Sequence, residues 1–266
     1  MSATRVRWLG WWYVAEQRVR QMRSYWLTDL LTTLGSPLLY LFGLGAGLGV
    51  LVDRSQGAAG VDGVPYLLFV SPALVLSAVL AHASEDNTWG LYGGFKWDRS
   101  FVAQSATPLT PRQMALGFQV GALIRSLVVA AGYVLVLALF GVVEWWRAVA
   151  VLPVAALLAL SVGFGVAAWV ARQREEYGQL SFVERFVVNP LALFSGTFYP
   201  LSVLPGYLQW IGWVSPLWHA CELGRLVMYG SPIGGWMVLV HVGYLLLVAA
   251  VAGWLTARAF VGRLGQ

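Results

Sequence analysis

The stretch LFSGTFYPLSVLPGYLQWIGWVSPLWHACELGR, residues 193–225, decides the fold that we predict for this chain. It is strongly apolar, yet Pro200, Pro205 and Pro216 interrupt it too closely for one straight helix to pass through. Broken backbone at membrane depth persists only where protein or a water-filled cavity covers its freed polar groups. We therefore expect a membrane-spanning helix that ends near Pro200, followed by short re-entrant or interfacial helices over 200–232. The alternative is an ordinary aromatic-rich external loop.

The composition around this stretch is that of an integral membrane protein. Of the 266 residues, 59% are hydrophobic and 11% are charged, whereas soluble proteins are about a quarter charged. No polar block is long enough to fold separately, so we expect residues 1–266 to form a single transmembrane domain. Its fold class is all-α, with six spans of roughly 20 residues or more. The expected spans are residues 27–52, 66–83, 114–143, 149–170, 180–199 and 234–257.

The segment before the first span predicts an amphipathic helix over residues 1–26. Its apolar residues, several of them tryptophan, recur at steps of three and four, and its arginines fall mostly between them. Such a helix suits the headgroup layer of an anionic leaflet, so membrane lipid is an expected partner. The alternative is a solvated helix that packs on a partner through the same apolar stripe.

The distribution of positive charge predicts the orientation. Twelve of the seventeen Lys and Arg residues lie in the N-terminal segment, the loop 84–113, the turn 172–179 and the C-terminus. The positive-inside rule therefore predicts a multi-pass protein of the cytoplasmic membrane with both termini cytoplasmic. The same rule places residues 200–232 on the outer side. The net charge of +5 then reflects orientation, and we expect no nucleic-acid partner.

The residue types exclude several kinds of chemistry. The only lysine, Lys96, lies between Phe95 and Trp97, so a phosphate-binding loop with Gly-Lys-Ser or Gly-Lys-Thr is absent from this sequence. Three scattered histidines and a single cysteine lack the spacing of a metal site. We expect no catalytic residue, no metal and no cofactor in this chain.

Arg125 stands out because it lies about ten residues into the third expected span. An unpaired cation there costs several kcal/mol, so its side chain should face protein or water. Glu184 and Arg185, at the start of the fifth expected span, are possible polar neighbours, and snorkelling to the cytoplasmic surface is the alternative. Every acidic residue falls at the edge of an expected span or in a loop. This disfavours an ion-driven carrier and favours energy delivered by a partner through the loop 84–113.

Two regions together resemble a known family. The run FKWDRSFVAQSATPLTP (95–111) leads into a span with an arginine, and LFSGTFYP is followed by LP and SPLWHACELGR. In both respects the chain resembles the type-2 ABC exporter permeases, in the branch of nodulation-factor exporter and daunorubicin-resistance permeases. The resemblance covers nearly the whole chain and implies two separate cytoplasmic ATPase subunits, which hold ATP and Mg, and a second permease copy, identical or similar.

The function implied by this resemblance is outward movement of an amphipathic molecule, either drug-like or similar to a glycolipid or lipo-oligosaccharide. The alternatives are a nucleotide-independent channel or a proton-coupled secondary carrier, and a membrane scaffold that transports nothing.

The resemblance also assigns two candidate sites. The loop 84–113 would contain a coupling helix seated in the ATPase, with the N-terminal helix beside it. The expected coupling residues are Glu85, Phe95, Lys96, Trp97, Asp98, Arg99 and Phe101. The expected outer gate consists of Phe198, Tyr199, Pro200, Pro205, Pro216, His219, Glu222 and Arg225. The last three share one helical face, which fits either a gate latch or a local polar cluster.

Overall fold

The computed structural model describes residues 3–22, 24, 26–56 and 60–265, and most of these are helical. Within that part of the chain there is no β-strand, only an isolated bridge between Val61 and Val64. Five helical segments are long and apolar enough to cross a membrane: Thr33–Ser55, Tyr66–Lys96, Pro111–Leu139, Trp145–Val170 and Gly235–Leu264. The expectation of a helical, multi-pass membrane protein is therefore confirmed, whereas the count of six spans stays a prediction.

The elements follow in this order. The first half contains α1 (Ala3–Met22), α2 (Trp26–Tyr40), η2 (Leu41–Gly49), α3 (Val50–Gln56), α4 (Tyr66–Glu85), η4 (Asp86–Gly90), α5 (Leu91–Lys96), α6 (Ser100–Ser105) and α7 (Pro111–Leu139). The second half contains α8 (Trp145–Val149), α9 (Leu152–Val170), α10 (Gln179–Val183), η5 (Glu184–Val188), α11 (Asn189–Phe194), η6 (Leu201–Val203), α12 (Gly206–Val214), α13 (Pro216–Tyr229) and α14 (Gly235–Leu264).

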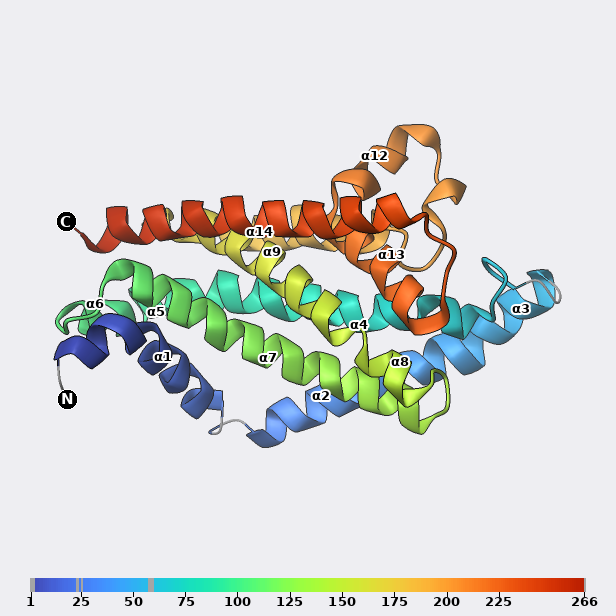
Figure 1. Ribbon diagram of the computed structural model, residues 1–266, viewed down its shortest axis with the longest axis horizontal. Helices are drawn as coiled ribbons and strands as arrows, with labels where there is room; N and C mark the ends of the chain where they lie inside the picture. Colours follow the sequence, from blue (N-terminus) through green and yellow to red (C-terminus); the bar gives the residue numbers. More distant parts are fainter. Residues whose placement is uncertain (1–2, 23, 25, 57–59, 266) are drawn as a thin grey trace.

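The centre of the bundle consists of α4, α7 and α9, which pack against one another. Around them, α14 packs along α9 and α7, α13 packs on α4, and α1 and α2 pack on α7. Both termini lie at the end of the bundle that holds α5 and α6, whereas α3 and α12 lie toward the opposite end (Figure 1). This common end for the termini is what an even number of crossings requires.

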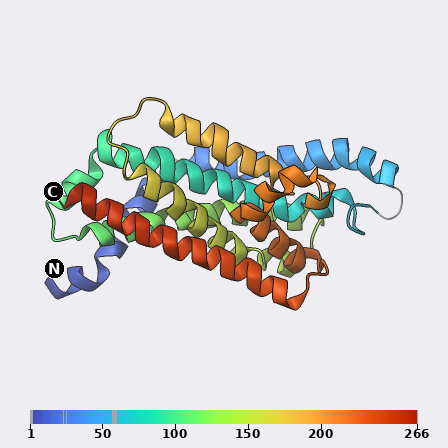
Figure 2. The same ribbon diagram turned by 90° about the horizontal axis from the view of Figure 1, so that it is seen from above.

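The expected fifth span is shorter than predicted. A continuous helix of 16 residues runs from Gln179 to Phe194, which corresponds to about 24 Å against about 30 Å of hydrocarbon. It ends five residues before the predicted end at Tyr199, and it is not among the five candidate spans. It nevertheless runs from the end that holds the termini toward the end that holds α12 (Figure 2).

The expected loop 84–113 begins inside a helix, so its predicted start is wrong. Because no proline lies between Pro72 and Pro108, the helix continues from α4 through η4 and α5 to Lys96. The short helix α6 follows, and α7 then begins with Pro111 at its first turn. Thr110 and Gln113 form a reciprocal capping box there, which satisfies two backbone N–H groups that would otherwise lack a partner.

The predicted break in residues 193–225 is confirmed. Pro200 precedes the 3-10 turn η6, Pro205 precedes α12, and Pro216 lies in the first turn of α13, where its missing N–H costs no helical hydrogen bond. The Ser215 hydroxyl accepts a hydrogen bond from the Leu217 N–H at 3.2 Å and so caps α13. The depth of this region in a membrane stays a prediction.

The predicted N-terminal helix is present as α1, and part of its apolar stripe packs within the chain. Val14 and Ala15 are buried against α7, where a Cβ added at Gly117 would lie 2.3 Å from the Trp11 carbonyl oxygen. Trp8 and Trp12 are 76% and 46% exposed. One face of α1 is therefore seated on α7, and the tryptophans remain available to the headgroup layer.

Candidate functional site: a buried polar network around η4

A single π-helical turn directs polar side chains into the bundle. This turn, η4, follows α4 directly, and Asp86, Asn87 and Thr88 in it are all buried. A π turn re-aims the side chains that follow it, and such turns are frequent at functional sites. The local backbone therefore brings one carboxylate, one amide and one hydroxyl to the centre of the helical bundle.

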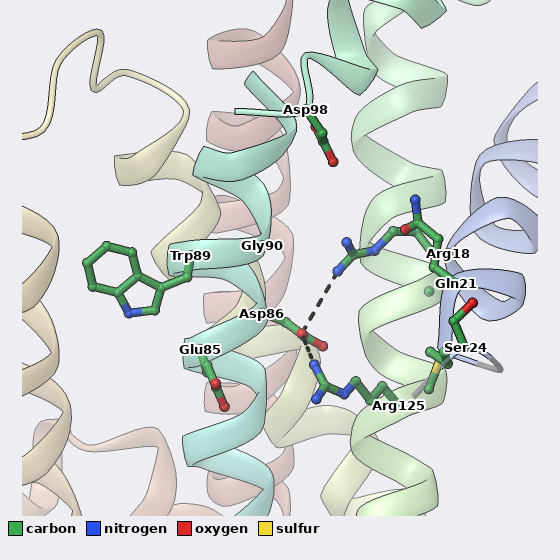
Figure 3. Close-up of a pocket in the computed structure, with 11 residues that line it drawn as sticks. Arg18, Gln21, Ser24, Glu85, Asp86, Trp89, Gly90, Asp98 and Arg125 are labelled. Atoms are coloured by element: carbon green, nitrogen blue, oxygen red, sulfur yellow. Dashed lines mark hydrogen bonds and ion pairs between the residues drawn. The ribbon is translucent and has the colours of Figure 1, made fainter. Parts of the chain in front are cut away.

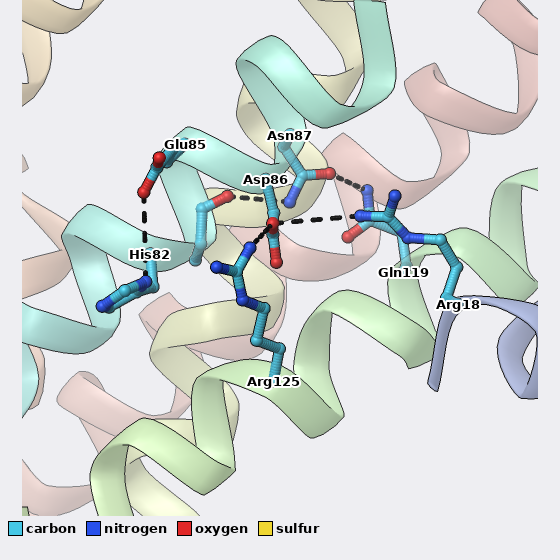
Figure 4. A network of polar contacts seen from close by, with 8 residues as sticks. Arg18, His82, Glu85, Asp86, Asn87, Gln119 and Arg125 are labelled. Atoms are coloured by element: carbon cyan, nitrogen blue, oxygen red, sulfur yellow. Dashed lines mark hydrogen bonds and ion pairs between the residues drawn. The ribbon is translucent and has the colours of Figure 1, made fainter. Parts of the chain in front are cut away.

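Asp86 is balanced by arginines from two other helices. Its Oδ1 lies 2.5 Å from Nη1 of Arg125 on α7 and 3.9 Å from Nη2 of Arg18 on α1 (Figure 4). Burial lowers the pKa of the Arg18 guanidinium, and the Asp86 carboxylate acts in the opposite direction. Because an arginine keeps its proton in proteins, both guanidinium groups are cations. The second oxygen, Asp86 Oδ2, has no hydrogen-bond partner among the described residues.

A pair of amides continues the network toward α9. Gln119 Nε2 on α7 donates to Asn87 Oδ1 at 2.5 Å, and Asn87 Nδ2 donates to the Ala83 carbonyl at 2.8 Å. Gly163 on α9 faces this pair, and a Cβ added there would lie 2.9 Å from Asn87 Nδ2 and 3.0 Å from Gln119 Oε1. The absence of a side chain at residue 163 is what lets α9 approach the two amides.

Glu184 joins the network from η5, a second π turn. Its Oε1 accepts hydrogen bonds from Ser84 Oγ at 2.8 Å and from Thr88 Oγ1 at 2.9 Å. Of the alternatives left open for Arg125, neither a contact with Glu184 nor snorkelling describes its ion pair, because Arg125 pairs with Asp86. Arg185 is exposed and makes no ion pair within the described part of the chain. Polar contacts thus connect α1, α4, α7, α9 and the short helix that contains η5.

A cavity of about 650 Å³ opens beside this network (Figure 3). Its lining combines two guanidinium groups, three carboxylates and the Trp89 ring. The lining residues are Arg18, Gln21, Met22, Ser24, Glu85, Asp86, Trp89, Gly90, Asp98, Gly121 and Arg125. Such a surface can hold polar groups of either sign. No cluster of three or more His, Cys, Asp or Glu residues suited to a metal ion occurs in the described ranges.

The sequence interpretation missed the centre of this site. It assigned Asp86 to a loop, treated Arg18 only as one of the headgroup-facing arginines of the N-terminal helix, and gave no role to Asn87 or Gln119. Two signals were present: no proline ends the second span after Ala83, and Ser84 and Thr88 lie four residues apart, hence on one helical face. The finding also weakens the argument against an ion-driven carrier, because Asp86 lies inside a candidate span rather than in a loop.

The expected coupling residues divide into anchors and exposed residues. Phe95 and Phe101 are buried and contact each other and Phe260, with ring centroids 4.6–5.2 Å apart. Trp97 is 65% exposed, and Asp98 and Arg99 beside it are also exposed.

Two of the coupling residues make contacts away from that exposed group. Lys96 Nζ binds Glu175 Oε1 at 2.6 Å, which ties α5 to the turn after α9. Glu85 lies ten residues before Phe95, about 15 Å along the helix, and its carboxylate is 4.0 Å from His82. Glu85 is therefore distant from Phe95 along the helix, although it lines the cavity of about 650 Å³ together with Asp98.

The expected gate residues on α13 make two separate sets of contacts. Arg225 is 2% exposed, and it donates to Glu222 Oε1 at 2.7 Å and to the Gly196 carbonyl at 2.5 Å. His219 lies with its Nδ1 2.8 Å from Nδ1 of His241 on α14, and its Nε2 is 3.0 Å from the Trp213 carbonyl.

The remaining gate residues lie between the end of α11 and the start of α13. The Phe198 carbonyl accepts from the Tyr66 hydroxyl at 3.3 Å, and the Tyr199 hydroxyl donates to the Leu193 carbonyl at 2.9 Å. The three gate prolines begin the short helical elements. These contacts tie α13 and the broken stretch to α4, α11 and α14.

A bundle of apolar helices, cross-linked at its centre by ion pairs and amides, defines a multi-pass membrane protein. The family model described as ABC-2 type transporter matches residues 10–229. The chain therefore belongs to the ABC-2 type transporter family, as its sequence predicts, and it is a permease of that family.

Named relatives agree over most of the chain. It is 30% identical over 257 residues to nodulation protein J of Rhizobium meliloti (strain 1021), which is 96% of this chain and 95% of that protein. It is also 30% identical over 258 residues to nodulation protein J of Rhizobium leguminosarum bv. viciae, with coverage of 96% and 95%. The inner membrane transport permease YadH of Escherichia coli (strain K12) is 23% identical over 218 residues, 79% of each chain.

Proposed function

We propose that this chain is the membrane subunit of an ABC exporter, powered by two separate cytoplasmic ATPase subunits that bind ATP and Mg. It would move an amphipathic molecule outward across the cytoplasmic membrane, either drug-like or similar to a glycolipid or lipo-oligosaccharide. In this proposal the chain itself hydrolyses nothing. Its helices convert motion of the ATPases into opening of a path through the membrane.

One observation carries the proposal: the exposed group Trp97, Asp98 and Arg99 is held rigidly on the bundle. The α5–α6 unit below it is anchored by buried phenylalanines, and the guanidinium of Arg263 lies 3.8 Å from the centroid of the Phe95 ring. A partner that pushes on Trp97 would therefore move α5, and with it η4, because the two are one continuous helix. The polar network would then transmit that movement to α1, α7 and α9.

A second permease copy is supported by the surface of the first span. Gly43 and Gly47 lie four residues apart, and a Cβ added to either meets no atom within 4 Å. Small residues four apart allow two helices to approach closely in a membrane. This face would therefore accept a helix of another copy.

The test is to co-express the chain with a candidate ATPase subunit and to reconstitute the complex in vesicles. Replacing Trp97 by Ala should weaken assembly about tenfold, because exposed tryptophans are frequent centres of binding energy. Trp145→Ala is the matched control, since Trp145 is 71% exposed on α8, away from α5 and α6. ATP-dependent uptake of an amphipathic dye into inside-out vesicles measures transport.

Three results would contradict this proposal. Failure of the wild-type chain to bind any ATPase favours a scaffold or a self-sufficient pore. Dye movement without nucleotide favours a channel, and movement abolished by a protonophore favours a proton-coupled carrier. Transport abolished by a protonophore would agree with one feature of the structure, because Asp86 is a buried carboxylate inside a candidate span.

A further inference from the structure

A second cavity, at the end of the bundle that holds the termini, is lined by four arginines. It measures about 300 Å³ and lies between the turn after α9 and the last turns of α14. Its lining residues are Ala171, Arg172, Arg174, Arg258, Ala259, Gly262 and Arg263, and none of them is acidic. The cavity therefore has the charge of an anion site.

Local structure holds two of these arginines in place. Arg263 Nη1 donates to the Ala171 carbonyl at 3.1 Å, and the same side chain packs over Phe95. The Arg258 guanidinium lies 3.8 Å from the centroid of the Trp254 ring. The dipole of α14 favours positive charge at its C-terminal end, but it corresponds to only about half an elementary charge. Four arginines exceed what the helix end itself can balance.

The nearby carboxylates have partners of their own, although Glu175 also acts electrostatically on Arg263. Glu175, in the same turn, binds Lys96 Nζ at 2.6 Å, and Glu176 Oε1 accepts from the Gly178 N–H at 2.7 Å. Arg172 lies exposed at the rim of the cavity, and Arg258 reaches it from α14. An anion that enters the cavity would therefore meet guanidinium donors that can bind a phosphate with two hydrogen bonds each.

An apolar surface leads directly to this cavity. Trp254, Val251 and Leu247 precede Arg258 by 4, 7 and 11 residues, so all four share one face of α14. These three side chains are 53%, 50% and 63% exposed. Tryptophan below arginine at the end of a membrane helix is the arrangement found where the hydrocarbon meets the headgroups. A soluble phosphate would not contact the apolar part of this surface, whereas the acyl chain of a lipid would lie along it.

We infer that this cavity binds the headgroup of an anionic phospholipid. The phosphate lies between Arg172 and Arg258, and an acyl chain follows the face of α14 that ends at Trp254. The bound lipid is a structural partner of the permease and does not need to be its cargo. Because Arg263 also packs on Phe95, the lipid lies directly behind the α5–α6 unit.

The experiment uses the purified full-length chain in detergent, without any ATPase, so it is independent of the proposed function. Native mass spectrometry measures binding of phosphatidylglycerol and of phosphatidylcholine. The variant R172Q/R258Q leaves Arg263 in place, since that residue also caps the carbonyls at the end of α9. It should bind phosphatidylglycerol on the order of tenfold more weakly, with phosphatidylcholine binding unchanged. R172K/R258K keeps the charge and should retain most of the affinity.

A matched control removes the same charge elsewhere. R54Q/R147Q replaces one arginine on α3 and one on α8, and it should leave phosphatidylglycerol binding unchanged. Equal binding of the two lipids to the wild type, or an equal loss in both double variants, would overturn the inference. So would inorganic phosphate at millimolar concentration raising the melting temperature as much as phosphatidylglycerol, since the site would then serve a soluble anion. If R172Q/R258Q does not fold, the binding of the two lipids to R258Q alone is compared with their binding to the wild type.

Discussion

Asp86 is a carboxylate that the fold can bury only because guanidinium groups approach it from two directions. Arg125 supplies the close contact, and Arg18 lies farther away at the end of α1. Breaking a buried ion pair by removing one partner costs about 3–5 kcal/mol, because the remaining charge stays uncompensated. The stability of the bundle and the geometry of the cavity therefore depend on the same side chains.

Replacing Arg125 by Gln tests this dependence. We expect the free energy of unfolding, measured by denaturant titration in detergent micelles, to fall by about 3 kcal/mol. Arg125→Gln combined with Asp86→Asn should recover at least half of that loss, because the carboxylate that has lost its closest partner is then removed. Arg20→Gln, which breaks an exposed pair with Glu16, should change stability by less than about 1 kcal/mol. Strictly additive losses in the double variant would contradict the pairing.

Gly163 offers a test with its control two residues away. An alanine there places a Cβ against the Asn87 and Gln119 amides, whereas a Cβ at Gly165 meets no atom within 4 Å. Gly163→Ala should lower the free energy of unfolding by about 1–3 kcal/mol, as overpacked sites do. Gly165→Ala should be neutral or slightly stabilising, since alanine favours helix. Equal effects of the two substitutions in the same titration would show that residue 163 is not a packing constraint.

At the scale of single residues, the sequence predicted that Arg125 needs a polar contact, but it did not predict which residue supplies that contact. The cost of a charge inside a span identifies Arg125 without any structure. Its partner lies 39 residues earlier in the chain, and one sequence does not tell which helices become neighbours. Asp86 was assigned to a loop because Gly90, Gly93 and Gly94 follow it closely. Their helix is held by packing on the surrounding elements, which local propensity does not report.

At the scale of elements, glycines determine how closely α1 approaches α7. Gly117 lies under Trp11 and Val14, and a Cβ added at Gly121 would lie 2.7 Å from the Arg18 Cβ. The Arg18 guanidinium stacks over Phe118 with its carbon 4.3 Å from the ring centroid. The two glycines thus set the position from which Arg18 reaches Asp86. The packing of α1 on α7 and the polar network around Asp86 therefore depend on each other.

Gly117→Ala should separate α1 from α7. The separation can be followed in a chain that carries Val14→Cys, because Val14 is 2% exposed and the native Cys221 is fully buried. Maleimide should label the introduced thiol on the order of tenfold faster when Gly117 is also Ala, a factor that corresponds to about 1.4 kcal/mol and lies within the usual cost of overpacking. Gly243→Ala, at a position where a Cβ meets no atom within 4 Å, should leave the labelling rate unchanged. Equal rates in all three chains would contradict the role of Gly117.

The second span was predicted to start at Tyr66, directly after Pro65, and α4 begins there, whereas the third span was predicted to start at Met114, three residues inside α7. Thr110 and Pro111 begin α7, and Ser215 and Pro216 begin α13, because both pairs act through local backbone chemistry. The end of the second span was predicted at Ala83 although nothing local stops the helix there. The helix that ends at Phe194 was predicted too long, since its last turn depends on side-chain contacts such as Thr197 Oγ1 to the Ala192 carbonyl at 2.8 Å.

At the scale of the whole molecule, the network lies between two apolar clusters. Ala83 belongs to the larger cluster, which extends through α4, α7, α9 and α13, and Leu91 belongs to the smaller one around Phe95 and Phe260. The π turn η4 connects the two. Helices α7 and α9 run through both clusters, and the polar contacts around η4 lie between the two clusters. Polar contacts can exchange partners more readily than packed apolar side chains.

The orientation of the chain can be tested directly. Green fluorescent protein fused to either terminus should fluoresce, because both termini lie at one end and that end carries most of the arginines. Alkaline phosphatase inserted after Pro232 should be active, as expected for an outer segment. Termini on opposite sides of the membrane would show that residues 179–199 do not cross, and the six-span prediction would then be wrong.

The packing of α1 on α7 also has a consequence for the time during which the chain is synthesised. The end of α7 at Leu139 lies 117 residues after the end of α1 at Met22, and at roughly 5–20 residues per second the synthesis of these residues takes roughly 6–23 s. During that interval Val14, Ala15 and Arg18 have no binding surface within the chain, and the membrane surface is the environment that suits a helix with exposed tryptophans and arginines. The amphipathic pattern of α1 thus serves two environments in succession, first the lipid headgroups and then the glycines of α7.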